Sequence, residues 1–231
     1  MPVTFITGAN KGLGYETARR LVALGHTVVV GARDAARGGA AAERLGARFV
    51  PIDVADDASV ARAAADVAAH EGRVDVLINN AGVIGAHGAA DQLTGSDALE
   101  VLNTNVAGIV RVTHAFLPLL RRAEHPAIVN VSSGMGSFDR THDPARVESK
   151  PVAPLYTASK AAVTMLTAQY AKALPDVRVN AADPGYTATD LNGHSGPQTV
   201  AEGTDAMVAL ATEGPAAGTG RFVDRDGPVP W

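Results

Sequence analysis

Cysteine is absent from this chain of 231 residues. Disulfide bonds, thiolate nucleophiles and cysteine-based metal sites are therefore excluded. The sequence also lacks any apolar run of about 18 residues, so no segment is expected to span a bilayer. Its N-terminus has neither the basic nor the apolar region of a signal peptide, and we expect a cytoplasmic protein. The net charge of -4 gives no reason to expect nucleic acid or an anionic membrane as a partner.

Hydrophobic residues make up 46% of the chain and charged residues 19%, which is typical of a soluble α/β enzyme. Strand-like segments (3–6, 26–31, 48–52, 74–78, 127–132, 177–181 and one near 220–223) alternate with helix-like ones (13–24, 34–45, 56–70, 97–122, 155–173 and 198–212). Segments 74–78 and 127–131 are apolar on both faces, as in a parallel sheet covered on both sides. The pattern predicts one domain over residues 1–231, a doubly wound α/β (Rossmann) fold.

A glycine-rich turn follows the first apolar segment. Glycines stand at positions 8, 12 and 14, directly before an apolar helical pattern. Such a turn lets the backbone approach a pyrophosphate closely, and the helix N-terminus beyond it offers free N–H groups. The spacing is G-x-x-x-G-x-G rather than the general G-x-G-x-x-G. The turn predicts a dinucleotide site, although a merely structural loop would also use glycine.

Tyr156 and Lys160 stand four residues apart at the start of a helical pattern, which places both side chains on one helix face. An ammonium beside a phenol lowers the phenol pKa toward working pH, as a general acid requires. A solvated helix face with a half-buried ring would give the same pair. The chain has only four lysines, and both Lys11 and Lys160 fall inside candidate motifs.

Polar residues also end two other predicted strands. Ser132 and Ser133 close the segment 127–132, where a hydroxyl could polarise a substrate carbonyl or simply end a strand. The run 79–82 reads Asn-Asn-Ala-Gly, which suits a turn or a close approach to a cofactor. Asn105 lies inside a predicted helix, and asparagine is a poor residue for a helix interior. A special task for Asn105 is therefore expected, although polar helix faces tolerate asparagine.

Taken together, these motifs resemble the short-chain dehydrogenase/reductase family, and within it the carbonyl-reductase-like members that use NADPH. The resemblance covers essentially the whole chain, and its motifs appear in the family's order, ending with Pro184-Gly185. It implies that Tyr156 is the general acid and that Lys160 lowers its pKa and holds the nicotinamide ribose. It further implies that Ser133 orients the carbonyl and that Asn105 supports a water-linked proton relay through Lys160.

Charge at the end of the second predicted strand indicates which nicotinamide cofactor binds. NAD-preferring relatives carry an acidic residue there, whereas this chain has Ala32 followed by Arg33. A guanidinium can bind a 2′-phosphate bidentately, and Lys11 is the family's other basic contact. Asp34 is expected to face the backbone as a helix N-cap. NADPH/NADP+ is the expected cofactor.

The cofactor-binding residues implied by the resemblance follow five of the predicted strands or lie in the predicted helix 155–173. They are Gly8, Asn10, Lys11, Gly12, Leu13, Gly14, Arg33, Asp53, Val54, Asn80, Ala81, Gly82, Tyr156, Lys160, Pro184, Gly185, Thr187 and Thr189. Met135, Phe138 and Tyr186 are expected to line the substrate pocket. No metal site is expected, because the histidines at 26, 70, 87, 114, 125, 142 and 194 lack metal-ligand spacing. Only those at 142 and 194 fall near the expected pocket.

Two long irregular segments are expected to be functional. Residues 134–154 form an insertion that separates Ser133 from Tyr156 by more than the family's usual spacing. Its many charges predict a solvated flap rather than a subunit interface, and hence a monomer rather than a homodimer. Residues 184–199 form a short substrate loop. The expected reaction is NADPH-dependent reduction of a small-molecule ketone or aldehyde, reversible as an alcohol dehydrogenase.

Two other functions remain open from the sequence. One is a non-catalytic redox sensor that binds NADP(H) on the same fold, although such proteins typically lose the tyrosine or the serine. The other is a lyase resembling halohydrin dehalogenases, which keeps both residues but fills the nicotinamide site with a halide pocket. The intact glycine turn argues against the lyase.

Overall fold

In the computed structural model, which describes residues 1–86 and 89–231, one sheet forms the centre of the molecule. Its strand order is β3-β2-β1-β4-β5-β6-β7-β8. The strands are β1 (Val3–Thr7), β2 (Thr27–Ala32), β3 (Arg48–Pro51), β4 (Val76–Asn79), β5 (Ala127–Val131), β6 (Arg178–Ala182), β7 (Phe222–Asp224) and β8 (Gly227–Pro228). All pairings are parallel except that of β7 with β8. The order reverses between β1 and β4, and ligands bind at the carboxyl ends of strands at such a point.

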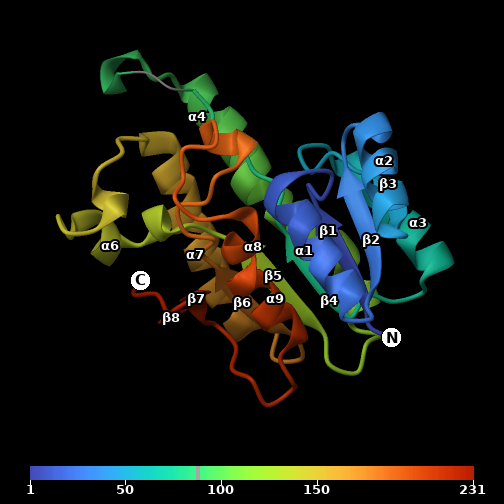
Figure 1. Ribbon diagram of the computed structural model, residues 1–231. Helices are drawn as coiled ribbons and strands as arrows, with labels where there is room; N and C mark the ends of the chain where they lie inside the picture. Colours follow the sequence, from blue (N-terminus) through green and yellow to red (C-terminus); the bar gives the residue numbers. More distant parts are fainter. Residues whose placement is uncertain (87–88) are drawn as a thin grey trace.

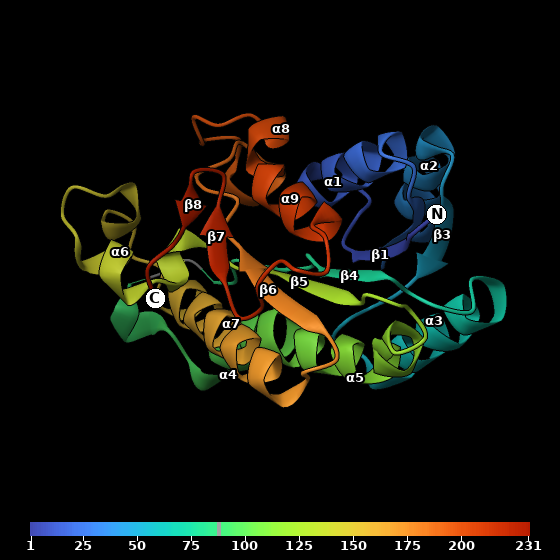
Figure 2. The ribbon, with the colours of Figure 1, turned by 90° about the horizontal axis from the view of Figure 1, so that it is seen from below.

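Helices cover both faces of this sheet (Figures 1 and 2). They are α1 (Gly12–Ala23), α2 (Ala35–Leu45), α3 (Asp57–His70), α4 (Gly95–Leu102), α5 (Gly108–Leu120), α6 (Phe138–His142), α7 (Pro154–Ala173), α8 (Val200–Gly203) and α9 (Asp205–Thr212). Figure 2 shows α1, α8 and α9 on one side of the sheet and α3, α4, α5 and α7 on the other. This is the expected doubly wound α/β architecture.

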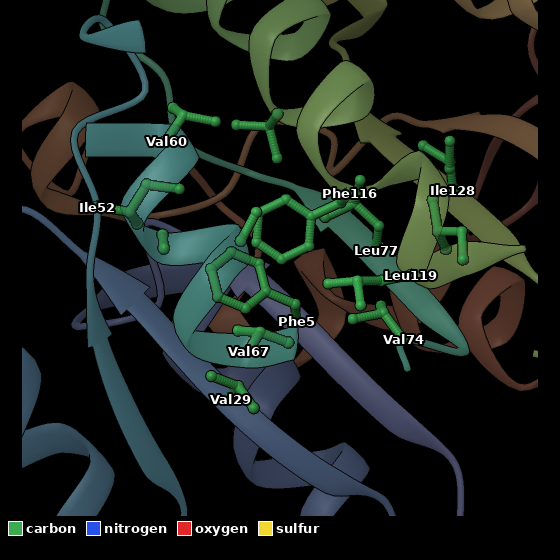
Figure 3. Close-up of a cluster of buried hydrophobic side chains, with 14 of the residues drawn as sticks. Phe5, Val29, Ile52, Val60, Val67, Val74, Leu77, Phe116, Leu119 and Ile128 are labelled. Carbon is green, nitrogen blue, oxygen red and sulfur yellow. The ribbon is translucent and has the colours of Figure 1, made fainter. Parts of the chain in front are cut away.

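Two separate apolar cores hold the layers together. One lies between the sheet and helices α3 and α5, where the rings of Phe5 and Phe116 meet with centroids 4.4 Å apart (Figure 3). The other lies between the sheet and helices α1, α2 and α9, and includes Ile6, Leu21 and Met207. Burying one such side chain contributes about 1.5–3 kcal/mol. The two-sided burial explains why the central strands are apolar on both faces.

Two predicted helices are interrupted. The segment expected as one helix over 97–122 is α4 and α5 joined by a π-helical segment, Asn103–Ala107, which contains Asn105. The segment expected over 198–212 divides at Thr204 into α8 and α9. Periodicity did not show these breaks, because a π turn or a one-residue junction changes the apolar pattern very little.

The segment 134–154 contains more regular structure than expected. It holds α6 and two short 3₁₀ turns, Gly134–Gly136 and Val147–Ser149. Figure 1 places α6 beside the C-terminus of the chain, and the Asp139 N–H donates to the Trp231 carbonyl across 3.4 Å. The β7–β8 hairpin at that end was only partly predicted, as a single strand near 220–223.

Membrane-spanning helices and metal-binding clusters were searched for among the described residues. None of the helices there is long and apolar enough to cross a membrane. They also contain no group of three or more histidine or acidic side chains placed to hold a metal ion. His87 lies outside the described residues.

Candidate active site

A cavity of about 330 Å³ opens at the carboxyl edge of the sheet, beside the point where the strand order reverses. Its volume is within the range of small-molecule and cofactor sites. Residues from six different strand ends, from the π-helical segment Asn103–Ala107 and from α7 form its wall. They are Gly8, Asn10, Lys11, Gly12, Leu13, Gly14, Ala32, Arg33, Asp34, Arg37, Ile52, Asp53, Val54, Asn80, Ala81, Gly82, Val83, Thr104, Val131, Ser132, Tyr156, Lys160, Pro184, Thr189, Asp190 and Leu191.

The glycine turn at this wall requires glycine for two different reasons. Gly8 and Gly12 have φ angles of 66° and 55°, which favour glycine. Gly14 has no such angle, but a Cβ there would lie 2.5 Å from Asn80 Nδ2 and 2.6 Å from the Gly8 carbonyl oxygen. Helix α1 begins at Gly12, and the Lys11 side chain does not cap its N–H groups. The turn therefore offers a close backbone approach and free donors to an anion.

Thr7 and Asn80 connect this turn to the end of β4. The Thr7 hydroxyl accepts hydrogen bonds from the N–H groups of Asn80 and Ala81, each across 3.0 Å. The Asn80 side chain donates to the Thr7 and Gly8 carbonyls across 2.9 and 3.1 Å. The amide predicted for cofactor binding thus also fixes the glycine turn. Thr7 was missed as a functional residue, since a threonine ending a strand has no distinguishing pattern.

Basic side chains gather where β2 ends. Arg33 is exposed on the cavity wall, and no side-chain hydrogen bond or ion pair joins it to the described residues. Arg37 also reaches the wall but pairs with Asp34 across 2.7 Å. Asp34 caps α2 by accepting from the Arg37 N–H across 2.9 Å, as predicted. Arg33 is therefore a guanidinium ready to bind an anion.

The Lys11 side chain forms an ion pair with Asp190, another residue of the cavity wall. Its Nζ lies 2.8 Å from Asp190 Oδ2, and both side chains are 54% exposed. His194 contacts the same carboxylate through Nε2 at 2.9 Å. These contacts lower the pKa of Asp190, with Lys11 the larger influence. Lys11 is thus a ligand available to an anion only in competition with Asp190.

Tyr156 and Lys160 lie together on the cavity wall, whereas the predicted Ser133 lies behind it. The Ser133 hydroxyl accepts from the Met135 N–H across 3.2 Å and acts on the Tyr156 phenol by lowering its pKa. Lys160 is buried, donates through Nζ to the Val131 carbonyl across 2.8 Å, and lies 5.6 Å from the centroid of the Tyr156 ring. Helix α7 begins at Pro154, and the four-residue spacing of Tyr156 and Lys160 places both on one helix face.

The pKa values of this pair move in the direction that burial dictates. Burial raises the pKa of the Tyr156 phenol to about 12, opposed by the hydrogen bond with Ser133. Burial lowers the pKa of Lys160 to about 8. The expected lowering of the tyrosine pKa is therefore not met by the protein alone, because desolvation of the phenol outweighs its neighbours. A phenol with a raised pKa is protonated at neutral pH, which is the form that can donate a proton.

Asn105 has a clear structural task within the π-helical segment. Its side chain accepts from the Val83 N–H and donates to the Val83 carbonyl, each across 2.8 Å. It also donates to Ser159 Oγ across 3.0 Å, on the same turn of α7 as Lys160. A Cβ on Gly82 would lie 3.3 Å from Asn105 Oδ1 and 3.8 Å from Lys160 Nζ. The predicted polar helix residue thus joins the end of β4 to the Tyr–Lys helix.

Several predicted residues lie outside the cavity wall. Thr187 is buried, donates to the Pro184 carbonyl across 2.8 Å and bridges to Gln198, and Gly185 packs against that same glutamine. The expected substrate residues Met135, Phe138 and Tyr186 and the two nearby histidines, His142 and His194, are likewise absent from the wall. Phe138 is 70% exposed, and the Tyr186 hydroxyl donates to Ser195.

Sequence reasoning missed other wall residues. Ile52, Val83, Thr104, Val131, Asp190 and Leu191 border the cavity although no motif singled them out. The first of the paired serines, Ser132, turns its hydroxyl to Thr164 (2.8 Å) and to the Lys160 carbonyl (3.1 Å), and so supports α7. The role of Ser133 in orienting a carbonyl stays a prediction, because Ser132 and not Ser133 borders the cavity.

Comparison with known proteins identifies the family. The model of the short chain dehydrogenase family matches residues 2–199. The chain belongs to the short-chain dehydrogenase/reductase family. A short-chain dehydrogenase of Penicillium roqueforti is 35% identical over 96% of this chain and 94% of its own. A (+)-neomenthol dehydrogenase of Capsicum annuum is 30% identical over 89% and 90% of the two chains.

A solved structure supports the same assignment. The NADPH-bound carbonyl reductase from chicken fatty liver is 29% identical to this chain and superposes with a TM-score of 0.88 over 100% of both chains. The two sequence relatives and the solved structure each match 89% or more of this chain.

Proposed function

We propose that this protein is an NADPH-dependent reductase of ketones or aldehydes, reversible as an alcohol dehydrogenase acting on CH–OH donors. The observation that carries the proposal is the placement of Tyr156 and Lys160 together on the cavity wall, with the Ser133 hydroxyl influencing the phenol from behind that wall. Another part of the wall carries the guanidinium of Arg33, which forms no ion pair with the described residues, at the position that discriminates between the two nicotinamide cofactors. One cavity thus offers an acid for a carbonyl oxygen and a cation for a 2′-phosphate.

The residues present fit a dinucleotide. Gly12 on the cavity wall faces open space, since a Cβ there would meet no atom within 4 Å, and the uncapped start of α1 supplies backbone N–H groups for a pyrophosphate. Asp53 and Val54 border the adenine end, and Pro184 and Thr189 border the nicotinamide end. When bound, NADPH supplies the hydride that reduces the carbonyl carbon.

The chain's own residues would supply the proton and orient the substrate. The Tyr156 O–H donates to the carbonyl oxygen as negative charge develops there. The Ser133 hydroxyl donates to the same oxygen and holds it against the phenol. Lys160 keeps its ammonium beside the tyrosine ring, which stabilises the phenolate left after proton transfer. Asn105, which bonds Ser159 on the same helix, fixes the turn that carries both groups.

The related proteins act on the same chemical class. The Capsicum annuum relative is named for the oxidation of an alcohol, neomenthol, and the chicken protein for the reduction of carbonyl compounds with NADPH bound. A redox sensor without catalysis would have no use for the intact Ser–Tyr–Lys group. A halide-binding lyase would have no use for the glycine turn or for Arg33. These observations favour the reductase over both alternatives.

The test is NADPH oxidation, followed by its near-ultraviolet absorbance, with a panel of aldehydes, ketones and quinones. Turnover with at least one carbonyl compound is expected. Tyr156→Phe keeps the ring but removes the transferable proton, so turnover should fall by about 10²–10⁴-fold, with little change in NADPH affinity. Near-normal turnover by this variant would refute the mechanism.

Tyr170→Phe is the matched control. Tyr170 lies on the same helix, α7, and packs against the apolar core away from the cavity wall. The variant should retain the turnover of the unmodified protein. A similar loss in both variants would mean that helix α7 is perturbed, rather than that a proton donor is removed.

A further inference from the structure

A buried ion cluster lies behind the candidate active site. The Arg140 side chain, only 10% exposed, contacts three carboxylates: Asp183 at 2.9 Å, Asp224 at 2.5 Å and Glu148 at 3.2 Å. Arg146 pairs with Glu148 from the outer side at 2.8 Å. The sequence predicted a solvated flap over 134–154. That prediction is wrong for Arg140 and Glu148, because the ends of β6 and β7 supply carboxylates that draw them inward.

Such a cluster is a poor way to gain stability. Removing several charges from water costs about as much as their attraction returns, and apolar replacements of buried ion pairs are often neutral or stabilising. A group of five charged side chains therefore calls for another explanation. The contacts of Asp183 supply one.

Asp183 joins two backbone segments that flank the reacting groups. Its Oδ1 accepts from the Gly185 N–H across 2.9 Å, and its Oδ2 packs so closely on Gly134 that a Cβ there would lie 2.8 Å away. Gly134 directly follows Ser133, and Gly185 follows Pro184 on the cavity wall. The Asp183 side chain is only 2% exposed, and Arg140 holds its second oxygen, Oδ2. One carboxylate thus fixes both sides of the site.

The packing around this carboxylate is tight. A Cβ on Gly134 would lie 2.8 Å from Asp183 Oδ2 and 2.7 Å from Glu148 Oε1. A Cβ on Gly136 would lie 2.6 Å from the carbonyl carbon of Lys160. The chain after Ser133 is therefore pressed between the cluster and the turn of α7 that carries the lysine, so a shift of the cluster would shift the serine.

We propose that Asp183 is a positioning residue of the reductase, which holds the Ser133 loop in register with Tyr156 and supplies a fixed negative charge behind the reacting pair. The proposal rests on the proposed function, since it gives Asp183 a task in that reaction. Arg140 is the group that keeps the Asp183 carboxylate in place. Neither residue touches the substrate.

Burial raises the pKa of Asp183, and the backbone N–H groups and the Arg140 guanidinium oppose that rise by favouring the carboxylate. The side chain accepts from the Gly185 N–H on one oxygen and from Arg140 on the other, which requires an acceptor on both arms. An amide has one oxygen and one NH₂ group. In Asp183→Asn, the NH₂ group would therefore face another hydrogen-bond donor, either a backbone N–H or the Arg140 guanidinium. The backbone of Gly134 or Gly185 would then have to move.

The charge of Asp183 also acts on its neighbours. The charged groups around it are Arg140 from α6, Glu148 from the following turn, Asp224 from β7, and the Tyr156–Lys160 pair on α7. Burial raises the pKa of Tyr156 and lowers that of Lys160, and the Asp183 charge raises both. Its removal should therefore lower both pKa values.

The experiment compares Asp183→Asn with the unmodified full chain, using a carbonyl substrate from the panel. Displacement of Ser133 should lower kcat/KM by about 10–100-fold, the usual cost of losing a positioning contact. The loss should fall mainly on kcat, and NADPH affinity measured by fluorescence titration should change little. In the pH profile of the unmodified protein, kcat/KM should fall as Lys160 loses its proton near pH 8. In Asp183→Asn this fall should occur at a lower pH.

Asp224→Asn is the matched control. It removes one charge from the same guanidinium, but its backbone contacts are the N–H groups of Asp226 and Gly227 in the β7–β8 turn. It should leave the pH profile unmoved and kcat/KM nearly unchanged. Equal effects of the two substitutions, or normal activity and pH profile in Asp183→Asn, would overturn the proposal.

A second variant guards against misfolding. If Asp183→Asn does not fold, Arg140→Lys keeps the charge but cannot reach the cluster's carboxylates from separate nitrogens as the guanidinium does. It should lower kcat while NADPH affinity is retained, and a normal kcat would overturn the proposal. Tyr156→Phe separates the two claims. If that variant is inactive while the cluster variants are normal, only the positioning role fails; if it remains active, the proposed function fails.

Discussion

Arg33 is the single residue that we propose to decide cofactor choice. Its side chain is exposed on the cavity wall, while the neighbouring Arg37 is held by Asp34. Ala32 precedes it at the end of β2, where an acidic residue would repel a 2′-phosphate. Because the neighbouring guanidinium is already paired, Arg33 is the cation at this strand end that can bind a phosphate without breaking an ion pair.

We therefore expect Arg33→Ala to weaken NADPH binding by about 1.5–3 kcal/mol, the value of a hydrogen bond to a charged group. NADH binding should hardly change, because NADH lacks the 2′-phosphate. Titration of each cofactor measures both effects. Arg62→Ala, on the exposed surface of α3, makes the same change in net charge and should affect neither cofactor. Equal losses for NADPH and NADH would assign Arg33 a structural role.

At the scale of single residues, the sequence motifs identified most of the candidate site residues but not the charged residues that pack behind them. Glycine spacing, Tyr156 and Lys160 are recognisable from sequence because the chemistry fixes both residue type and interval. Asp183 and Arg140 are separated by 43 positions, and nothing in the sequence pairs a strand-end aspartate with an arginine in an insertion. Their contact exists only because β6 and α6 meet in three dimensions.

At the scale of elements, the π-helical segment Asn103–Ala107 does the most to shape the site. Its extra residue is closed by the Gly108 N–H, which donates to the Asn103 carbonyl. The segment turns Asn105 toward Val83, whose N–H and carbonyl both bond to the asparagine side chain. Without the extra residue of the π turn, the side chains on one side of it would point in a different direction around the helix axis. π-bulges occur frequently at functional sites for this reason.

Asn105→Ala should lower the free energy of unfolding by about 1–3 kcal/mol, since it leaves the backbone groups of Val83 without their partner. Urea unfolding monitored by circular dichroism would show a lower midpoint with an unchanged slope. Asn103→Ala, in the same π-helical segment but bonded to the partly exposed Arg111, is the control and should cost less. Equal costs would mean that the segment, and not the Asn105–Val83 contact, carries the stability.

At the scale of the whole molecule, helices cover both faces of the sheet, so most of the surface of the described residues belongs to helices, loops and the edge strands β3 and β8. Exposed charged residues of the 134–154 segment include Asp139, Asp143 and Lys150. The cores of obligate interfaces are depleted in charge, so these residues disfavour a permanent contact there. Apolar side chains are nevertheless exposed on other elements, among them Leu99 on α4 and Met165 on α7.

We predict a monomer, measured as a mass near 23.6 kDa by light scattering coupled to size-exclusion chromatography. A stable tetramer would contradict this prediction. If a dimer is found instead, two variants identify its interface. Leu99→Asp should dissociate a dimer that forms through α4. Asp139→Ala should dissociate a dimer that forms through the 134–154 segment. The two variants thus separate an apolar interface from a polar one.

The sequence by itself determined the fold class and the order of the strands along the chain, and it singled out the residues that we propose as the Ser–Tyr–Lys group. Each of these rests on local information: apolar periods, glycine turns and short intervals on one helix. Only the tertiary structure decided the break at Asn105, the pKa directions of Tyr156 and Lys160 and the burial of Arg140. These depend on which groups lie nearby after folding, because desolvation and hydrogen bonding are set by contacts between residues far apart in sequence.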